Sequence, residues 1–185
     1  MKMKNIKNNF GIVTILIHWI MAVIVIGLFV LGTYMMSLDY YDPFYHTGPW
    51  WHKGFGLLVA FLLIPRIVWR IINPKVQPIV NHKTYEIKLA LIMQYVLYLL
   101  IIVCCISGYM ISTAEDAGIS FFGAFEVPAL ISKGKSQADL AGQIHYYSTL
   151  ALIILASLHM LAALKHHFFD KDKTLIRILK TGDTT

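Results

Sequence analysis

The sequence predicts an all-α protein, a membrane-embedded four-helix bundle with both termini in the cytoplasm, and three observations favour this fold class. First, the chain is 57% hydrophobic and 14% charged, whereas a soluble domain usually carries about 25% charged residues. Second, four segments are long and apolar enough to cross a bilayer. Third, the basic residues gather at the ends of those segments. This pattern excludes a soluble enzyme, a disordered chain and a nucleic-acid-binding module, despite a net charge of +6.

The spans are expected at about residues 11–36, 48–72, 89–113 and 140–168, within one transmembrane domain that covers residues 1–185. Each span offers the roughly 20 apolar residues that a membrane helix needs. Strands of a membrane barrel are shorter and alternate in polarity, so a barrel is excluded. The first span is too long for a signal peptide, and no small-residue cleavage site follows it. We therefore expect it to be retained.

The distribution of Lys and Arg predicts the orientation. Of the 16 basic residues, all but three fall on the side of the two termini. The three on the opposite side are Lys53, Lys133 and Lys135. The positive-inside rule therefore places both termini in the cytoplasm. The outer loops hold six carboxylates. The longest outer loop, 114–139, has an aromatic centre that predicts a segment on the membrane surface or over a pocket.

Four of the eight histidines fall within the spans: His18, His52, His145 and His159. His145 and His159 are 14 residues apart on one helix, which corresponds to about 21 Å along the axis and to nearly the same face. The direction of each span then places His52 level with His145, and His18 level with His159. A single intramembrane histidine often only bonds a neighbouring helix. Four histidines at two matching depths instead favour a role as ligands of a bound group.

Two histidine pairs across a four-helix bundle predict two haem groups, each held by two imidazoles. Haem b is favoured over haem c because the chain has no Cys-x-x-Cys-His motif. A zinc site would need three or four ligands in one cluster, with help from Cys or carboxylate, and we expect no such cluster. A proton relay would need Asp or Glu within the membrane, and the predicted spans contain neither.

Two arginines lie one turn apart in the inner half of the second span. A charged side chain at the bilayer centre costs about 2.5–3.5 kcal/mol on insertion scales, so each arginine needs an anionic partner or a route to the surface. We expect Arg66 to meet a haem propionate or a quinone carbonyl, and Arg70 to reach a lipid phosphate.

His166 follows His159 by two helical turns, on the same face, at the end of the fourth span. Its imidazole can donate a hydrogen bond to a quinone and relay protons from the cytoplasm. The alternative is a basic cluster of His166 with its neighbours Lys165 and His167 that touches lipid headgroups. His46 and His82 fall in predicted loops, where we expect them to be solvated.

At this point the sequence resembles the bacterial cytochrome b561 family of small dihaem membrane proteins, over nearly the whole chain. The matching motifs are Ile17-His18-Trp19, His52-Lys53-Gly54, Arg66-Ile67-Val68-Trp69-Arg70, Gln143-Ile144-His145, Leu158-His159-Met160, Lys165-His166-His167-Phe168-Phe169 and Asp172-Lys173-Thr174-Leu175-Ile176-Arg177. The spacing of the histidines is the most specific part of this resemblance. It implies a multi-pass protein of the bacterial inner membrane.

The sequence is most similar to the branch that includes superoxide oxidase, which passes electrons from superoxide at the outer face through two haems b to ubiquinone. By this resemblance His18 and His159 bind the inner haem, His52 and His145 bind the outer haem, and His166 lies beside the quinone. An enzyme that uses an anion should attract it with positive charge. Because the outer loops are acidic overall, this role is expected of a local basic patch around Lys53.

Two other functions remain open from the sequence. The first is the cytochrome b electron-transfer subunit of a quinone-linked dehydrogenase, of the hydrogenase or formate dehydrogenase type, which would dock an iron–sulfur partner. The second is a module without redox chemistry, such as a transporter or an assembly factor, that uses its histidines for metal or for packing.

Overall fold

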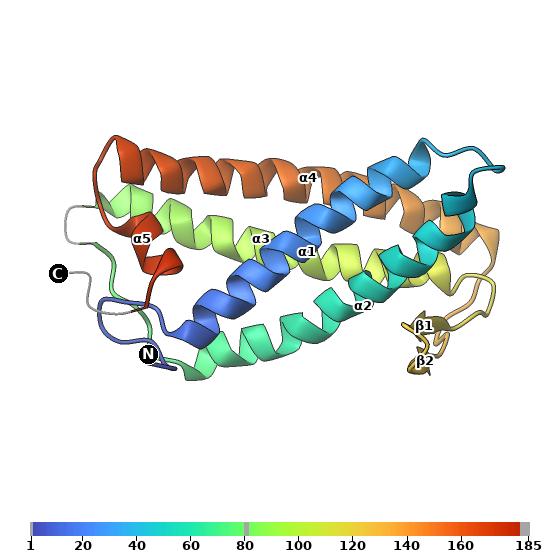
Figure 1. Cartoon of the computed structure of the whole chain (residues 1–185), viewed down its shortest axis with the longest axis horizontal. Coiled ribbons are helices and arrows are strands. Elements are labelled where there is room, and N and C mark those ends of the chain that lie inside the picture. The colour runs from blue at the N-terminus through green and yellow to red at the C-terminus, as the bar shows by residue number, and fades with distance from the viewer. Residues whose placement is uncertain (1, 80–81, 182–185) are drawn as a thin grey trace. The chain divides into compact units, whose positions relative to one another are not determined.

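The computed structural model describes residues 2–79 and 82–181 and is mainly helical, which confirms the all-α class (Figure 1). The elements, in chain order, are α1 (Ile12–Met36), α2 (Pro43–Ile72), α3 (Thr84–Ser112), β1 (Ile119–Phe121), β2 (Phe125–Val127), α4 (Lys135–Phe168) and α5 (Thr174–Leu179). Among the described residues, four helices (α1, α2, α3 and α4) are long and apolar enough to cross a membrane. Many of their large apolar side chains are exposed, as expected of side chains that face lipid.

Three of these helices begin about one turn before the predicted starts. α2 begins at Pro43, a residue suited to the first helical position because its backbone is already fixed near the helical φ. α3 begins at Thr84, where the carboxylate of Glu86 accepts a hydrogen bond from the backbone N–H of Lys83 at 2.9 Å. This bond satisfies one of the free amides at the helix start. The extra turns are interfacial, and apolar periodicity alone does not reveal them.

The chain divides into two compact units, each of which contains a part of all four long helices. Unit 1 comprises residues 1–22, 62–97 and 154–185, and unit 2 comprises residues 23–61 and 98–153. Ile15, Met21 and Leu63 are buried in unit 1. Val59, Ala141 and Leu152 are buried in unit 2.

Within unit 1, the N-terminal segment, the loop after α2 and the C-terminal segment contact one another. The side-chain amide of Asn5 donates to the carbonyl of Pro74 at 2.9 Å. Arg177 of α5 donates to the carbonyl of Gln77 at 3.0 Å, and the indole N–H of Trp19 donates to the carbonyl of Ile178 at 2.8 Å. These bonds place at one end of unit 1 the basic segments that the sequence assigned to one side of the membrane. The assignment of that side to the cytoplasm stays a prediction.

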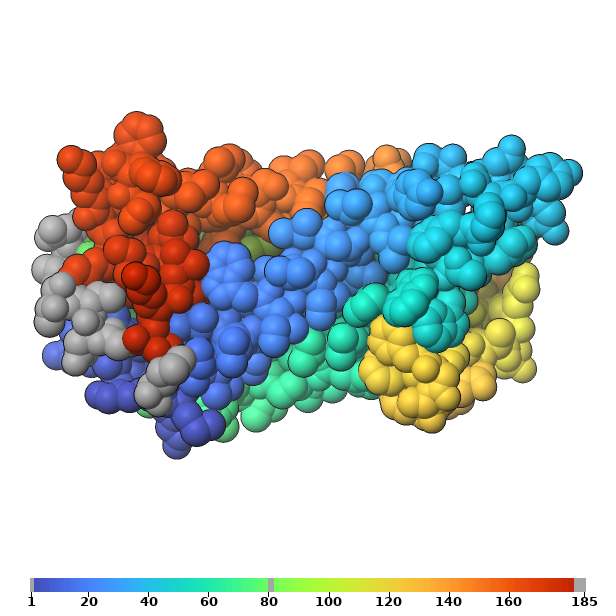
Figure 2. Space-filling view, in the orientation of Figure 1, coloured from blue at the N-terminus to red at the C-terminus, as the bar shows by residue number. Residues whose placement is uncertain are grey.

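Within unit 2, the connection between α3 and α4 contains a short antiparallel hairpin, in which Phe121 pairs with Phe125. Phe122 and Gly123 at its turn both have positive φ, at 50° and 80°. Glycine adopts this conformation without a steric cost, whereas Phe122 does so at a cost of about 1–2 kcal/mol. The hairpin packs against α2, as the contact between its yellow atoms and the teal atoms of α2 shows in Figure 2. The segment expected to cover a surface or a pocket is therefore a hairpin seated on a helix.

Candidate functional site

His52 of α2 and His145 of α4 face each other within unit 2. Their ring centroids are 6.2 Å apart, and the ring planes are inclined by 77°. A metal held at about 2 Å from one nitrogen of each imidazole would separate the centroids by about 6 Å, because each centroid lies roughly 1 Å behind its nitrogen. The observed separation therefore fits an iron between the two rings.

Hydrogen bonds fix the orientation of His145. Its Nδ1 lies 3.0 Å from the carbonyl oxygen of Cys104 and 3.1 Å from the hydroxyl oxygen of Ser107. A carbonyl only accepts, so Nδ1 carries the proton and Nε2 of the neutral ring has a free lone pair. Ligating histidines in proteins are commonly held in this way, by a bond from the second ring nitrogen to a carbonyl. His145 is therefore arranged as a ligand through Nε2.

The Nδ1 atom of His52 is buried and has no hydrogen-bond partner in the described part of the chain. A buried polar nitrogen without a partner costs about 1–3 kcal/mol, so native structures usually satisfy it. Coordination of a metal through Nδ1 would satisfy this atom.

Two glycines allow the backbone to approach these rings closely. A Cβ on Gly32 of α1 would stand 3.2 Å from Cε1 of His52, and a Cβ on Gly108 of α3 would stand 3.1 Å from Cε1 of His145. Both distances are shorter than an ordinary van der Waals contact between carbons, which is about 3.5–4.0 Å. Ser107 and Gly108 were not among the site residues predicted from the sequence, but the structure places both against a candidate ligand.

Unit 1 contains the second histidine pair, with an arginine beside it. His18 of α1, Arg66 of α2 and His159 of α4 lie close enough to interact electrostatically. Nη2 of Arg66 donates to Nδ1 of His18 at 3.2 Å. A guanidinium only donates, so Nδ1 of His18 is the unprotonated nitrogen in this arrangement. Arg66 thus meets a histidine in the structure, where the sequence predicted a propionate or a quinone.

Arg70, one turn further along α2, also has a protein partner. Its guanidinium donates to the side-chain oxygen of Gln94 at 2.7 Å and lies over the ring of Tyr95, 5.6 Å from the centroid. Both partners belong to α3. The expectation that Arg70 simply extends to a lipid phosphate was therefore incomplete, because the inner half of α3 supplies polar and aromatic contacts for it.

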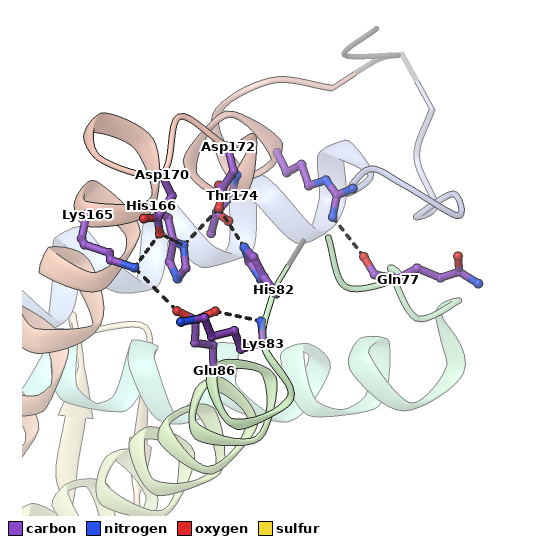
Figure 3. A network of polar contacts seen from close by, with 10 residues as sticks. Gln77, His82, Lys83, Glu86, Lys165, His166, Asp170, Asp172 and Thr174 are labelled. Carbon is purple, nitrogen blue, oxygen red and sulfur yellow. Dashed lines mark hydrogen bonds and ion pairs between the residues drawn. The ribbon is translucent and has the colours of Figure 1, made fainter. Parts of the chain in front are cut away.

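The end of α4 joins a polar network in unit 1 (Figure 3). Nδ1 of His166 lies 2.8 Å from Oδ2 of Asp170 and 3.0 Å from Oδ2 of Asp172. Oδ2 of Asp172 also lies 2.8 Å from Nε2 of His82. The ammonium of Lys165 pairs with Asp170 at 2.6 Å. The side chain of His82 is only 16% exposed, so the expectation that it is solvated was wrong.

The carboxylate of Asp172 anchors this network. Burial alone would raise its pKa, but hydrogen bonds from Thr174 and His82 and the proximity of His166 lower the pKa to about 2. Its Oδ1 accepts the backbone N–H of Thr174 at 2.7 Å, at the start of α5. The network also creates a cluster of three potential metal ligands, His82, His166 and Asp172, whose ligand atoms all lie within 4.8 Å of one another. The prediction that no such cluster exists was therefore wrong.

On the other unit, Lys53 is exposed and directly follows His52 in α2. The next residue, Gly54, is buried under the hairpin, where a Cβ would overlap the ring of Phe122. The ring of Phe122 also contacts the rings of Trp50 and Phe55, with centroids 5.5 Å and 5.1 Å away. An aromatic cluster therefore lies beside the segment that carries His52, and Lys53 is an exposed cation next to it.

The comparisons with known proteins bear on this arrangement. A sequence model described as Prokaryotic cytochrome b561 matches residues 9–181. The chain belongs to this family. It is 41% identical to Cytochrome b561 homolog 2 of Escherichia coli (strain K12) over 179 residues, which cover 97% of this chain and 95% of that protein.

More distant relatives extend the family. Probable superoxide oxidase CybB of Yersinia pestis is 29% identical over 171 residues, which cover 88% of this chain and 91% of that protein. Cytochrome b561 homolog 1 of Escherichia coli (strain K12) is 27% identical over 180 residues, which cover 93% of this chain and 97% of that protein. The chain is thus a multi-pass bacterial membrane cytochrome b of the electron-transfer type, and the family implies that it binds haem b.

Proposed function

We propose that this cytochrome b561 is a superoxide:ubiquinone oxidoreductase of the bacterial inner membrane that holds two haems b, one in each unit. Each bound haem b supplies a one-electron carrier. Two superoxide anions release two electrons and become two molecules of dioxygen, and ubiquinone takes up those electrons with two protons to become ubiquinol. The observation that carries the proposal is the opposed pair of His52 and His145.

The proposed ligands of the outer haem are His52 and His145. The carbonyl of Cys104 and the hydroxyl of Ser107 hold the proton of His145 on Nδ1, so that Nε2 would bind the iron through its lone pair. Gly32 and Gly108 keep the space beside the two rings narrow, which restricts how far each imidazole can turn. These contacts pre-organise the pair.

The proposed ligands of the inner haem are His18 and His159. Ligation by Nε2 of His18 requires the proton to lie on Nδ1, and a protonated Nδ1 cannot accept the hydrogen bond from Arg66. Arg66 would then exchange His18 for an anionic partner, and a haem propionate has the charge it needs. Arg66 would thus bond His18 in the absence of haem and a propionate in its presence.

The proposed quinone site lies beside His166 at the end of α4. One ring nitrogen, Nδ1, faces the carboxylates of Asp170 and Asp172, and the imidazolium form, which carries a proton on both nitrogens, can also donate from Nε2 to a quinone carbonyl. A pocket of about 560 Å³, lined in part by His82, Lys83 and the two aspartates, adjoins this network. His166 can therefore pass protons from the pocket to the reduced quinone.

We infer that superoxide is the electron donor, because one relative is named as a probable superoxide oxidase, and that Lys53 attracts this anion.

One observation favours a second function. The three lysines on the predicted outer side are outnumbered by six carboxylates, and all nine residues belong to unit 2. An acidic outer surface suits docking of a basic protein, as expected of the cytochrome b subunit of a quinone-linked dehydrogenase of the hydrogenase or formate dehydrogenase type.

The test uses the purified chain in lipid nanodiscs. Haem is quantified first, and two haems b per chain are expected. A superoxide source is then added in the presence of ubiquinone, and haem reduction and ubiquinol formation are followed. Lys53→Gln should slow haem reduction several-fold, whereas Lys133→Gln serves as the matched control on the outer loops.

The outcomes separate the hypotheses. Two haems without rapid reduction by superoxide would eliminate this donor and favour the dehydrogenase subunit. A chain that binds no haem would eliminate both the superoxide oxidoreductase and the dehydrogenase subunit. His166→Ala should keep both haems and slow ubiquinone reduction, and unchanged quinone kinetics would return His166 to a contact with lipid headgroups.

A further inference from the structure

The polar network of unit 1 contains a group of side chains that electron transfer does not require together. His82 precedes α3, His166 lies at the end of α4, and Asp172 precedes α5, so the group joins three segments that are distant in sequence (Figure 3). Their side chains are 16%, 15% and 13% exposed. Two imidazoles and a carboxylate, largely withdrawn from solvent, are the donor types that first-row transition metals prefer.

The distances within this group suit one shared ion. Oδ2 of Asp172 lies 2.8 Å from Nε2 of His82 and 3.0 Å from Nδ1 of His166. In a tetrahedral site with metal–ligand bonds of about 2.0–2.2 Å, neighbouring donor atoms lie roughly 3.3 Å apart. Each imidazole nitrogen therefore needs to move away from Oδ2 by only a few tenths of an ångström, and all three ligand atoms lie within 4.8 Å of one another.

The second oxygen of Asp172 is already occupied, which orients the carboxylate. Oδ1 accepts the backbone N–H of Thr174 at 2.7 Å, so Oδ2 is directed toward the two imidazoles. Hydrogen bonds that hold a ligating carboxylate in place are typical of metal sites.

A second group in the same network, Glu86, His166 and Asp170, differs because a lysine pairs with its carboxylates. Glu86 and Asp170 also lie near His166, but Lys165 lies 3.6 Å from Glu86 and 2.6 Å from Asp170. An ammonium thus neutralises those carboxylates. Asp172 instead faces two imidazole nitrogens, which can bind a metal ion once the protons they share with the carboxylate are released.

We propose that His82, His166 and Asp172 form a binding site for one divalent transition-metal ion of the Zn²⁺ type. Asp170, whose Oδ2 lies 2.8 Å from Nδ1 of His166, is positioned to contribute a fourth ligand or to hold a bound water. The ion ties the loop after α2 and the segment before α5 to the end of α4. This assignment does not depend on haem or on the electron donor.

The test is calorimetric titration of the full-length chain in nanodiscs, without a polyhistidine tag, with ZnCl₂. One equivalent should bind, and His82→Asn and Asp172→Asn should each weaken binding on the order of tenfold or more. Asp172→Asn retains an oxygen for the N–H of Thr174. His167→Asn, beside His166 on α4 but outside the group, is the matched control and should bind as the wild type does.

Two further measurements make the result decisive. X-ray absorption at the zinc edge should report nitrogen and oxygen ligands at about 2.0–2.2 Å. Titration with MgCl₂ should give no comparable heat, because Mg²⁺ prefers six oxygen ligands. Absent stoichiometric zinc binding, equal binding by Mg²⁺, or unchanged zinc affinity in both ligand variants would each overturn the proposal. Thermal unfolding of each variant establishes that it is folded.

Discussion

Replacing Gly108 by alanine tests whether the close packing around His145 serves a haem. The added Cβ would stand 3.1 Å from Cε1 and 3.4 Å from Nδ1 of His145. The ring cannot simply move aside, because its Nδ1 is bonded to the carbonyl of Cys104 at 3.0 Å. Overpacking of this kind costs about 1–3 kcal/mol. If that cost falls on the bound state, the outer haem should bind about 5- to 150-fold more weakly.

The assay is titration of haem into protein produced under haem limitation, with the two haems distinguished by their low-spin electron paramagnetic resonance signals. One signal should weaken and the other should persist. Gly142→Ala is the matched control, because a Cβ there meets no atom within 4 Å among the described residues. Normal haem affinity and two unchanged signals in Gly108→Ala would refute the assignment of His145 as a ligand.

Three other predictions concern separate parts of the molecule. His159→Ala should remove one haem and leave the other spectrally present, and loss of neither by haem quantitation would contradict the ligand assignment. Ser107→Ala removes an acceptor 3.1 Å from Nδ1 of His145, a bond worth about 0.5–1.5 kcal/mol, and should raise one midpoint potential by about 20–60 mV in a redox titration. The pKa of Asp172 is lowered from 3.8 to about 2, so its stabilising contribution is complete above pH 4 and is lost as the pH falls toward 2. The melting temperatures of the wild type and Asp172→Asn should therefore differ at pH 7 and converge near pH 2, and a constant difference would show that the carboxylate charge is not responsible.

The four long helices could be predicted from the sequence because a lipid-facing helix is apolar over its full length. The proximity of His52 and His145 was also accessible, since depth in a membrane follows from position along a span. The residues that orient the ring of His145 could not be predicted from the sequence. Ser107 and Gly108 become meaningful only once α3 is rotated to face α4, and no periodicity reports that rotation when a helix is apolar all round.

The polar network at the end of α4 was missed for a different reason. Its members come from the loop before α3, the end of α4 and the segment before α5, and their meeting depends on how those connections fold back. His82 looked like a solvated loop histidine because sequence position gives no sign that Asp172 lies beside it. The available signal was His82 in one predicted inner segment and Asp170 and Asp172 in another.

The aromatic hairpin suggests how this scaffold could acquire new reaction partners. The turn at Phe122 and Gly123 is closed by its own backbone, with Ala124 donating to the carbonyl of Phe121 at 2.9 Å. The opposed imidazoles are built from helices α2 and α4 instead. Grafting a different sequence onto residues 119–127 would therefore change the surface beside Lys53 without replacing either imidazole, which makes this segment a target for engineering the proposed donor site.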